Sequence, residues 1–397
     1  MIRYQNNLTE SLLAPASSPW TLDSSTLGAD GAAESWSVRC YTLAGGLQEG
    51  VSVVEIDNGS LRFAVLPTRG MGIWKGSCGP VHLGWDSPVE RPVHPGFIQP
   101  LELGGLGWLK GFNEWIVRCG LQSTGAPGND TITDNNGNPA EVFLPLHGNI
   151  ANLPARDVEL VVTDRSLVLR GRVDEAMVFG ARLRLDAEIV TDFGSGALTI
   201  RDTVTNLGRK PVDHELLYHV NYGEPLLGNG SRLLVPSKEV APRDPRAAEG
   251  IDSFDRYGAP RPGFVEQAYW FVPAGKRGSG ETLAMLRDPS GTKAAVLRFS
   301  LKDFPCFTQW KNTAAREDGY VTGLEPSTSY PNPRRFERER GRVIRLEGGE
   351  SRTTTLTHET LLDRESVRAA EDEIERIQNG VRRTIHPEPI AKLSELP

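Results

Sequence analysis

The sequence contains few cysteines, with four thiols among 397 residues and no C-x-x-C pair. A zinc ribbon needs clustered cysteines and a small disulfide scaffold needs many of them, so neither class of fold is predicted. Isolated thiols are typical of a reducing compartment, and a cytoplasmic location is therefore expected. The four residues are Cys40, Cys78, Cys119 and Cys306.

Long apolar runs and an excess of positive charge are also missing. No stretch approaches the roughly 18 apolar residues of a membrane helix, and the first twenty residues do not form a convincing signal peptide. The chain has 51 acidic residues against 44 Lys and Arg, a net charge of −7. Nucleic acids and anionic membranes attract basic patches, so the charge argues against both as partners.

The familiar catalytic motifs are absent from the sequence. There is no G-x-S-x-G, Walker A or H-E-x-x-H pattern, and the glycines at 104–107 do not form the G-x-G-x-x-G that opens a dinucleotide-binding helix. Among seven histidines only His214 and His219 are close, and an interval of five residues places them on opposite faces of a strand. Neither a metal nor a cofactor is predicted.

Apolar and polar residues alternate along much of the chain. Met177–Val190 places Leu183, Leu185 and Ile189 on one face and charged residues on the other, which is typical of a half-buried antiparallel strand. The 42 glycines and 28 prolines exceed their usual combined share of about 12% and indicate frequent turns. More than ten strands predict an all-β protein, a large antiparallel sandwich or a barrel. The other candidates are Val51–Ile56, Leu61–Leu66, Val158–Val162, Leu167–Val173, Leu198–Asn206, Leu216–Val220, Leu283–Leu286, Ala294–Phe299, Val343–Leu346 and Thr353–Thr357.

Two further segments stand apart from this pattern. Arg364–Gln378 has helical periodicity and is expected to be a short C-terminal helix packed on the sheet, whereas the tail from Val381, with three prolines, is expected to be poorly ordered. Trp74–Asn138 lacks alternation and predicts a long functional loop. Its Trp74, Trp85, Trp108 and Trp115 offer flat faces that suit a sugar ring, or else they fill a second small core.

Four polar residues interrupt apolar stretches. They are His147 in LPLHGNI, His219 in ELLYHVNYG, Glu325 in YVTGLEPST and Arg69 in VLPTRGMGI. Burying such groups is costly unless they are paired. A carboxylate and an imidazole can perform acid–base chemistry; the alternative is a set of satisfied core histidines and a solvated strand end. No paired-carboxylate motif supports a glycosidase.

Five segments together resemble the DUF4432, aldose 1-epimerase-like branch of the galactose mutarotase superfamily. They are LPTRGMGIWKG, GFNEWIVRCGLQSTGAPG, LPLHGNIANLPAR, LLYHVNYGEPLL and FTQWKN…GYVTGLEPSTSYPN, within residues 51–362. The resemblance implies a supersandwich domain over 51–362 with a sugar-binding cleft, an N-terminal extension with first strands over 1–50, and a C-terminal helix and tail over 363–397.

The resemblance also implies that the protein interconverts the anomers of a free sugar without a cofactor. Glu325 corresponds to the family's general base, His219 to its acid, and His147 to a histidine that binds a hydroxyl and stabilises charge on the ring oxygen. An unperturbed Glu is ionised near pH 7, and the pKa of a His beside it is expected to be raised.

The remaining candidates concern substrate binding. Asn113, Glu114, Gln309 and Trp310 are expected in the cleft. The family's substrate-binding Asp has only Asp252 and Asp255 as candidates, by their order in the chain. Arg69, Arg118 and Lys311 would form a basic cleft for an acidic or phosphorylated sugar, although Arg69 could equally anchor a strand to a loop. A sugar-binding protein without turnover, or another carbohydrate enzyme such as a lyase, are the alternative functions. The sequence does not indicate which sugar binds or the oligomeric state.

Overall fold

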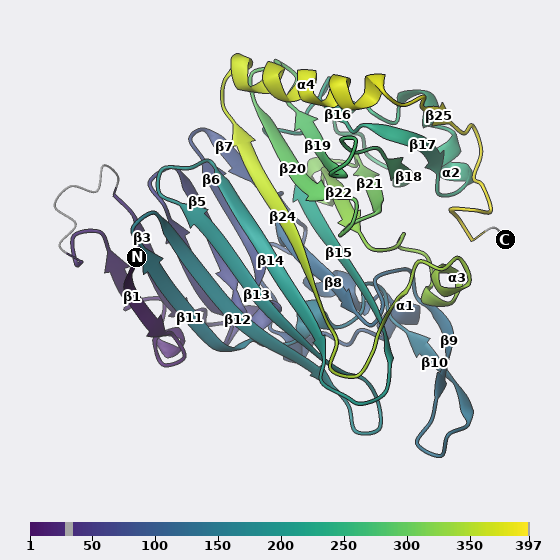
Figure 1. The fold of residues 1–397 in the computed structure, drawn as a ribbon. Coiled ribbons are helices and arrows are strands. Elements are labelled where there is room, and N and C mark those ends of the chain that lie inside the picture. The colour runs from purple at the N-terminus through teal and green to yellow at the C-terminus, as the bar shows by residue number, and fades with distance from the viewer. Residues whose placement is uncertain (28–34, 396–397) are drawn as a thin grey trace.

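Two large β-sheets pack face to face and form most of the molecule (Figure 1). The computed structural model describes residues 1–27 and 35–395. Among these residues, the first sheet has nine strands and is antiparallel throughout. In spatial order its strands are β1 (Ile2–Asn7), β11 (Arg156–Thr163), β12 (Ser166–Ala176), β13 (Arg182–Asp192), β14 (Ala197–Asn206), β24 (Ser351–Leu361), β20 (Ala294–Ser300), β19 (Glu281–Arg287) and β16 (Arg232–Leu234).

The second sheet has fourteen strands in the described part of the chain, and β25 joins its edge in parallel. The order is β2 (Trp20–Asp23), β3 (Ser37–Thr42), β4 (Ser52–Asp57), β5 (Leu61–Leu66), β6 (Gly72–Cys78), β8 (Ile116–Leu121), β15 (Val212–Tyr222), β22 (Val321–Ser327), β21 (Cys306–Asn312), β18 (Gln267–Pro273), β17 (Ser237–Pro242) and β25 (Thr384–Ile385), with β7 (Val81–Leu83) beside β6 and β23 (Ile344–Leu346) beside β15. A separate hairpin is formed by β9 (Gly128–Thr133) and β10 (Pro139–Leu144).

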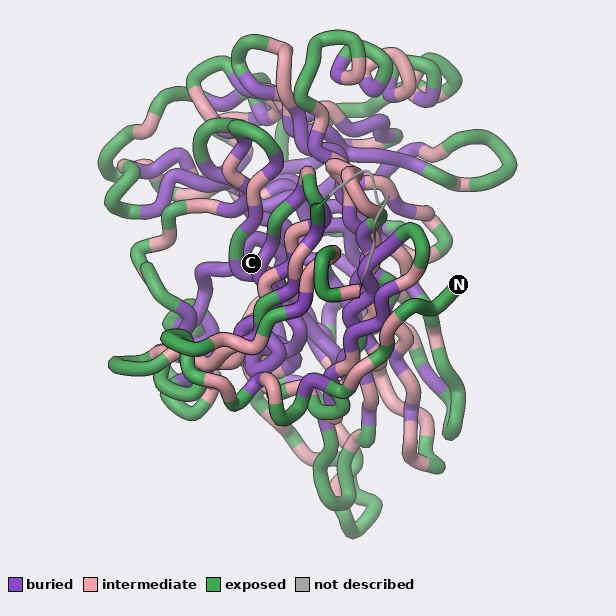
Figure 2. Tube along the Cα trace, turned by 90° about the vertical axis from the view of Figure 1, so that its left-hand side faces the viewer, coloured by how far each residue is buried: buried purple, intermediate pink, exposed green. Residues whose placement is uncertain are grey.

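The hydrophobic core lies between the two sheets, where Figure 2 shows the buried trace. Alternation places one face of each strand in this core: Leu183, Leu185 and Ile189 of β13 are at most 1% exposed, while charged neighbours face outward. The predicted all-β sandwich is confirmed. The division into segments 1–50, 51–362 and 363–397 stays a prediction.

Two expectations along the chain are wrong in detail. The strand predicted over Met177–Val190 begins only at Arg182, because Met177–Ala181 forms the turn between β12 and β13, in which the Gly180 amide donates to the Met177 carbonyl at 3.1 Å. The loop predicted over Trp74–Asn138 contains β7, β8, β9 and the end of β6. All six residues of β8 are buried, so this strand has no alternation for a sequence pattern to detect.

The C-terminal helix α4 (Arg364–Asn379) packs on the nine-stranded sheet, where Figure 1 shows it crossing the ends of β19 and β20. Its apolar stripe is buried, as predicted. The tail is not loose, however: β25 pairs with β17, and Trp270 Nε1 donates to Ser394 Oγ at 2.9 Å. The other α-helices are single turns or little more: α1 (Glu102–Gly105), α2 (Pro245–Ala248) and α3 (Arg334–Glu339).

A buried ion pair crosses the core between the sheets. Arg118 of β8 donates through Nη2 to Asp202 Oδ1 of β14 at 2.9 Å, and Tyr218 of β15 donates to Asp202 Oδ2 at 2.5 Å. Arg118 also donates through Nη1 to the Met71 carbonyl at 2.6 Å. The three polar side chains are at most 1% exposed. These contacts pin the centre of one sheet to the centre of the other.

Candidate functional site

The candidate site lies on the outer face of the fourteen-stranded sheet, where β15 and β22 run side by side. Tyr218 points inward to Asp202, so the next residue, His219, points outward. Glu325 lies on the neighbouring strand, one residue beyond the Val220–Leu324 pair. His219 Nε2 and Glu325 Oε1 are 3.2 Å apart, and the two residues are 4% and 1% exposed. The contact lacks the alignment of a full hydrogen bond.

His147 completes this cluster from a turn that follows β10. Its ring centroid is 5.5 Å from that of His219, and its Nδ1 lies 2.7 Å from the Thr124 carbonyl oxygen. The backbone of His147 is left-handed, with φ of 60°. Only glycine fits at the following position, because a Cβ on Gly148 would lie 2.4 Å from the Gly120 carbonyl oxygen. The turn therefore fixes His147 over the sheet.

Aromatic rings surround the two histidines. Trp108, in the 3₁₀-helix η5 (Gly107–Gly111), lies 4.6 Å from His147 between ring centroids, and Phe112 and Trp310 lie 5.0 and 5.4 Å from His219. Trp85 contacts Phe112 at 5.1 Å. Trp85 and Trp310 are partly exposed. Within residues 1–27 and 35–395, the buried Nε1 of Trp108 has no hydrogen-bond partner.

Burial is the largest cause of the pKa shifts of both His219 and Glu325. It raises the pKa of Glu325 well above its ordinary value, the nearby Glu266 raises it further, and Arg243 opposes the change. Burial likewise lowers the pKa of His219 well below its ordinary value; His147 adds to this effect and the hydrogen bond to Asn221 opposes it. The expected ionised Glu325 and raised pKa of His219 are therefore wrong in direction. Both shifts favour the uncharged forms of the pair, a protonated Glu325 carboxyl group and a neutral His219 imidazole.

His147 is an uncharged hydrogen-bond acceptor at neutral pH. Burial lowers its pKa to about 4, although the bond to the Thr124 carbonyl favours the charged form. A carbonyl oxygen can only accept, so Nδ1 carries the proton and Nε2 presents a lone pair. This nitrogen can accept a hydrogen bond from a hydroxyl but cannot donate one.

A carboxylate that the sequence analysis missed lies at the edge of the cluster. Trp310 Nε1 donates to Glu266, and Arg243 Nη2 donates to Glu266 Oε1 at 3.0 Å. Glu266 directly precedes β18, and a surface glutamate there has no distinctive sequence pattern. The two aspartates proposed from chain order do not fill this place: Asp252 is exposed, and Asp255 pairs with Arg232 at 2.6 Å.

Three predicted site residues point the wrong way. Gln309 donates to the Phe254 carbonyl at 2.8 Å, and Lys311 donates to the Arg256 carbonyl at 2.6 Å; both lie on the core side of β21, opposite Trp310. Arg118 faces the core as well, against Asp202. Successive residues of a strand point to opposite faces, so Gln309, Trp310 and Lys311 cannot all line one site.

Three more predicted site residues hold the loop of residues 84–115, which carries Trp85, Trp108 and Phe112, rather than face the site. They are Arg69, Asn113 and Glu114. Arg69 Nε donates to Glu114 Oε1 at 2.6 Å, and its other donors reach the Gly111 and Val93 carbonyls. Asn113 donates to the Val89 carbonyl at 2.9 Å. Because Arg69, Arg118 and Lys311 are each engaged internally, the predicted basic cleft does not form. Arg69 acts as the anchor between strand and loop that was its alternative interpretation.

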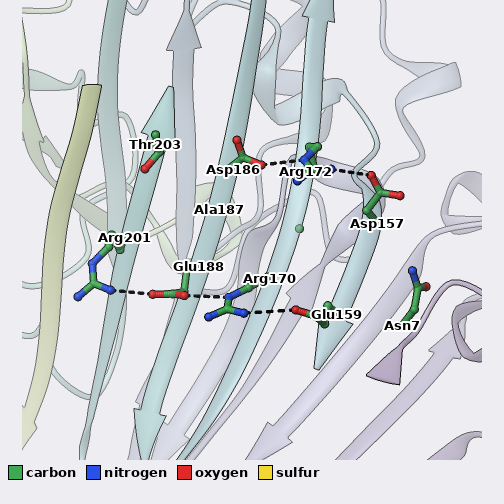
Figure 3. A pocket seen from close by; sticks show the side chains of 11 residues that line it. Asn7, Asp157, Glu159, Arg170, Arg172, Asp186, Ala187, Glu188, Arg201 and Thr203 are labelled. Atoms are coloured by element: carbon green, nitrogen blue, oxygen red, sulfur yellow. Dashed lines mark hydrogen bonds and ion pairs between the residues drawn. The ribbon is translucent and has the colours of Figure 1, made fainter. Parts of the chain in front are cut away.

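A hollow of about 410 Å³ on the outer face of the nine-stranded sheet is not this site (Figure 3). Arg170 there pairs with Glu188 and Glu159, and Arg172 pairs with Asp186. The charges neutralise one another on an exposed face, and neither the histidines nor Glu325 lies in the hollow. The acid–base groups and the aromatic rings instead gather around His219.

A glycine on β22 leaves the space that the His–Glu pair occupies. A Cβ on Gly323 would lie 2.7 Å from His219 Cε1 and 2.9 Å from Glu325 Oε1, closer than real contacts allow. We expect Gly323→Ala to lower the free energy of unfolding by about 1–3 kcal/mol through overpacking. Chemical denaturation would measure this change. Gly258→Ala is the control, since nothing lies within 4 Å of its Cβ; equal denaturation midpoints for both variants would contradict the expectation.

No group of three or more His, Cys, Asp or Glu side chains among residues 1–27 and 35–395 is arranged to hold a metal ion. None of the helices in that same part of the chain is long and apolar enough to cross a membrane.

Comparison with known proteins places these features in a context. The model of the DUF4432 family, a domain of unknown function, matches residues 48–360. A Klebsiella pneumoniae protein described as a "putative aldose 1-epimerase" is 33% identical, with 98% of each chain covered and a TM-score of 0.87. No curated protein matches the sequence.

Two more distant structures share the fold alone. A galactose mutarotase-like protein of Clostridium acetobutylicum is 12% identical, with 86% of this chain and 98% of that chain covered and a TM-score of 0.55. A galactose 1-epimerase of Lactobacillus acidophilus is also 12% identical, with 81% and 98% covered and a TM-score of 0.53.

Proposed function

The chain belongs to the DUF4432 family, and from this premise we propose that it is a carbohydrate isomerase that interconverts the anomers of a free sugar. The names of its structural neighbours, aldose 1-epimerase and galactose 1-epimerase, support this class of reaction. The observation that carries the proposal is the contact of 3.2 Å between His219 and Glu325 beneath a cover of aromatic rings.

The reaction needs one group that takes a proton from the O1 hydroxyl and one that gives a proton to the ring oxygen O5. Glu325 is proposed as the base and His219 as the acid. O1 and O5 are bonded to the same carbon, so two groups in contact can reach both oxygens. Low exposure of the pair excludes water and strengthens the interactions that stabilise the transition state.

The steps conserve the one proton that Glu325 and His219 Nε2 exchange. A transfer within the pair first gives the Glu325 carboxylate and the His219 imidazolium. Glu325 then takes the O1 proton, the carbonyl bond forms at C1, the C1–O5 bond breaks, and O5 takes the proton from His219 Nε2. The open chain rotates about C1–C2, and the same steps run backwards on the other face. Neither a cofactor nor an external oxidant enters this balance.

The polar groups of the site suit a neutral sugar. His147 Nε2 accepts a hydroxyl hydrogen, the free Nε1 of Trp108 donates to a hydroxyl oxygen, and Glu266 adds an acceptor at the edge. The apolar faces of Trp310 and Phe112 can pack on a sugar ring. The carboxyl group of Glu266 lies near the site and Arg243 is already paired to it, which disfavours the acidic or phosphorylated sugar that a basic cleft would have bound.

Magnetisation-exchange NMR tests the proposal with a panel of neutral aldoses, sugar acids and sugar phosphates. We expect anomer exchange above the spontaneous rate, in proportion to protein concentration, for at least one neutral aldose. Binding of a sugar without exchange would instead favour a sensor, and cleavage of oligosaccharides would favour another carbohydrate enzyme. Either result would refute the isomerase proposal.

A further inference from the structure

The side-chain amide of Asn221 has only one orientation that satisfies its surroundings. Its Nδ2 lies 2.9 Å from the Glu114 carbonyl oxygen and 3.2 Å from the His219 carbonyl oxygen. Both carbonyls can only accept hydrogen bonds, so the donor end of the amide must face them. The oxygen end, Oδ1, therefore faces His219 Nδ1, at a distance of 2.6 Å.

This orientation determines which ring nitrogen of His219 carries a proton. An amide oxygen facing Nδ1 at 2.6 Å requires an N–H there, because two acceptors at that distance would repel each other in a buried site. The neutral ring then has its lone pair on Nε2, which lies 3.2 Å from Glu325 Oε1. We propose that Asn221 is a positioning residue that locks His219 in the Nδ1–H tautomer, so that the ring gains and loses protons only at Nε2.

The hydrogen bond from Asn221 to the Glu114 carbonyl is supported by a buried ion pair between Arg69 and the Glu114 side chain. Arg69 Nε donates to Glu114 Oε1 at 2.6 Å, and the backbone N–H of Asn113 donates to Glu114 Oε2 at 3.1 Å. The side chains of Arg69 and Glu114 are fully buried. The ion pair therefore holds Glu114 in place, and the Glu114 carbonyl in turn orients the Asn221 amide. The loop that carries the aromatic rings thus also determines which nitrogen of His219 is protonated.

The inference deepens and rests on the proposed function, in which His219 Nε2 must give a proton to O5 and recover it later. If the neutral ring carried its proton on Nε2 instead, that atom could not receive a proton from Glu325 or from the sugar. The lone pair would then lie on Nδ1, facing Asn221, and could accept a proton from neither Glu325 nor the sugar. With the lock in place, every proton that leaves Nε2 can return to it.

The tautomer can be read directly from the ¹⁵N chemical shifts of the histidine rings. The chain has seven histidines, and the signals of His219 are identified by their loss in His219→Gln. Wild-type protein is compared with Asn221→Ala, which removes both ends of the amide, and with Asn221→Asp, which keeps an acceptor at Nδ1 and removes only the donors. Asn206→Ala is the matched control, because Asn206 is also buried and donates to the Lys210 carbonyl at 2.8 Å, but it lies on β14 in the other sheet.

We expect the Nδ1–H tautomer in wild type, Asn221→Asp and Asn206→Ala, and a shift toward Nε2–H in Asn221→Ala. In the exchange assay Asn221→Ala should lower kcat by about 10–100-fold with little change in KM, as losses of orienting partners do, and Asn221→Asp should recover part of it. Wild-type His219 with its proton on Nε2, or Asn221→Ala with unchanged tautomer and kcat, would overturn the lock. A tautomer shift in a protein that exchanges no sugar would support the lock and refute the proposed function.

Discussion

Glu325→Gln is expected to lower kcat for anomer exchange by about 10²–10⁴-fold, the usual contribution of a positioned acid or base. Glutamine keeps the size of the side chain and its hydrogen-bonding atoms, but it cannot take or release a proton. The change in KM should be small because the aromatic rings and His147 remain. Magnetisation-exchange rates at saturating sugar would give the comparison.

Glu215→Gln is the matched control for this substitution. Glu215 is also a buried glutamate, it lies on β15, and burial raises its pKa to about 8. Its carboxyl oxygens accept hydrogen bonds from Ser329 Oγ and the Thr124 backbone N–H rather than contacting His219. We expect this variant to exchange sugar at nearly the wild-type rate. If Glu325→Gln also kept the wild-type rate for every sugar that the protein turns over, Glu325 would not be the base.

Asp202→Asn should lower the free energy of unfolding by about 3–5 kcal/mol, because it leaves the Arg118 cation buried between the sheets without a counter-charge. Asp202 accepts from Arg118 and from Tyr218, so one substitution disturbs two strands of the opposite sheet. Urea denaturation followed by tryptophan fluorescence would measure the loss. The double variant Arg118→Met/Asp202→Leu should recover much of it, since an apolar replacement removes both charges together.

An exposed ion pair provides the contrast. Arg170→Ala removes the pairs with Glu188 and Glu159 on the outer face of the nine-stranded sheet, where about half of the Arg170 side chain is exposed. Such surface pairs contribute about 0–1 kcal/mol. If Asp202→Asn shifted the denaturation midpoint no more than Arg170→Ala, the ion pair across the core would not contribute as we infer.

The fold was largely predictable where strands have one buried face and one solvent-exposed face. Leu61–Leu66 and the helix beginning at Arg364 were predicted with nearly the observed bounds. Two kinds of segment escaped prediction. The strand β8 is covered on both faces and so has no alternation, and the C-terminal tail is held by contacts with β17 and Trp270 that lie far away in the sequence.

The candidate site was only partly accessible to sequence reasoning. His219 and Glu325 stood out as polar residues within apolar runs, and the structure brings them into contact. Gln309 and Lys311 are polar, but strand alternation turns both side chains toward the core. Asn221 was missed, although its position two residues after His219 on a strand puts both side chains on the same face. Glu266 is brought to the site only by its contacts with Trp310 and Arg243, which are distant from it in the sequence.

The position of the His–Glu pair at the middle of the fourteen-stranded sheet affects when during synthesis the proposed activity could arise. Its central strands β8, β15 and β22 come from widely separated parts of the chain, and β22 is synthesised long after the other two. Pairing of such strands closes long loops and is slow. We therefore expect a nascent chain on the ribosome to have no catalytic competence until the last of these strands has emerged and inserted.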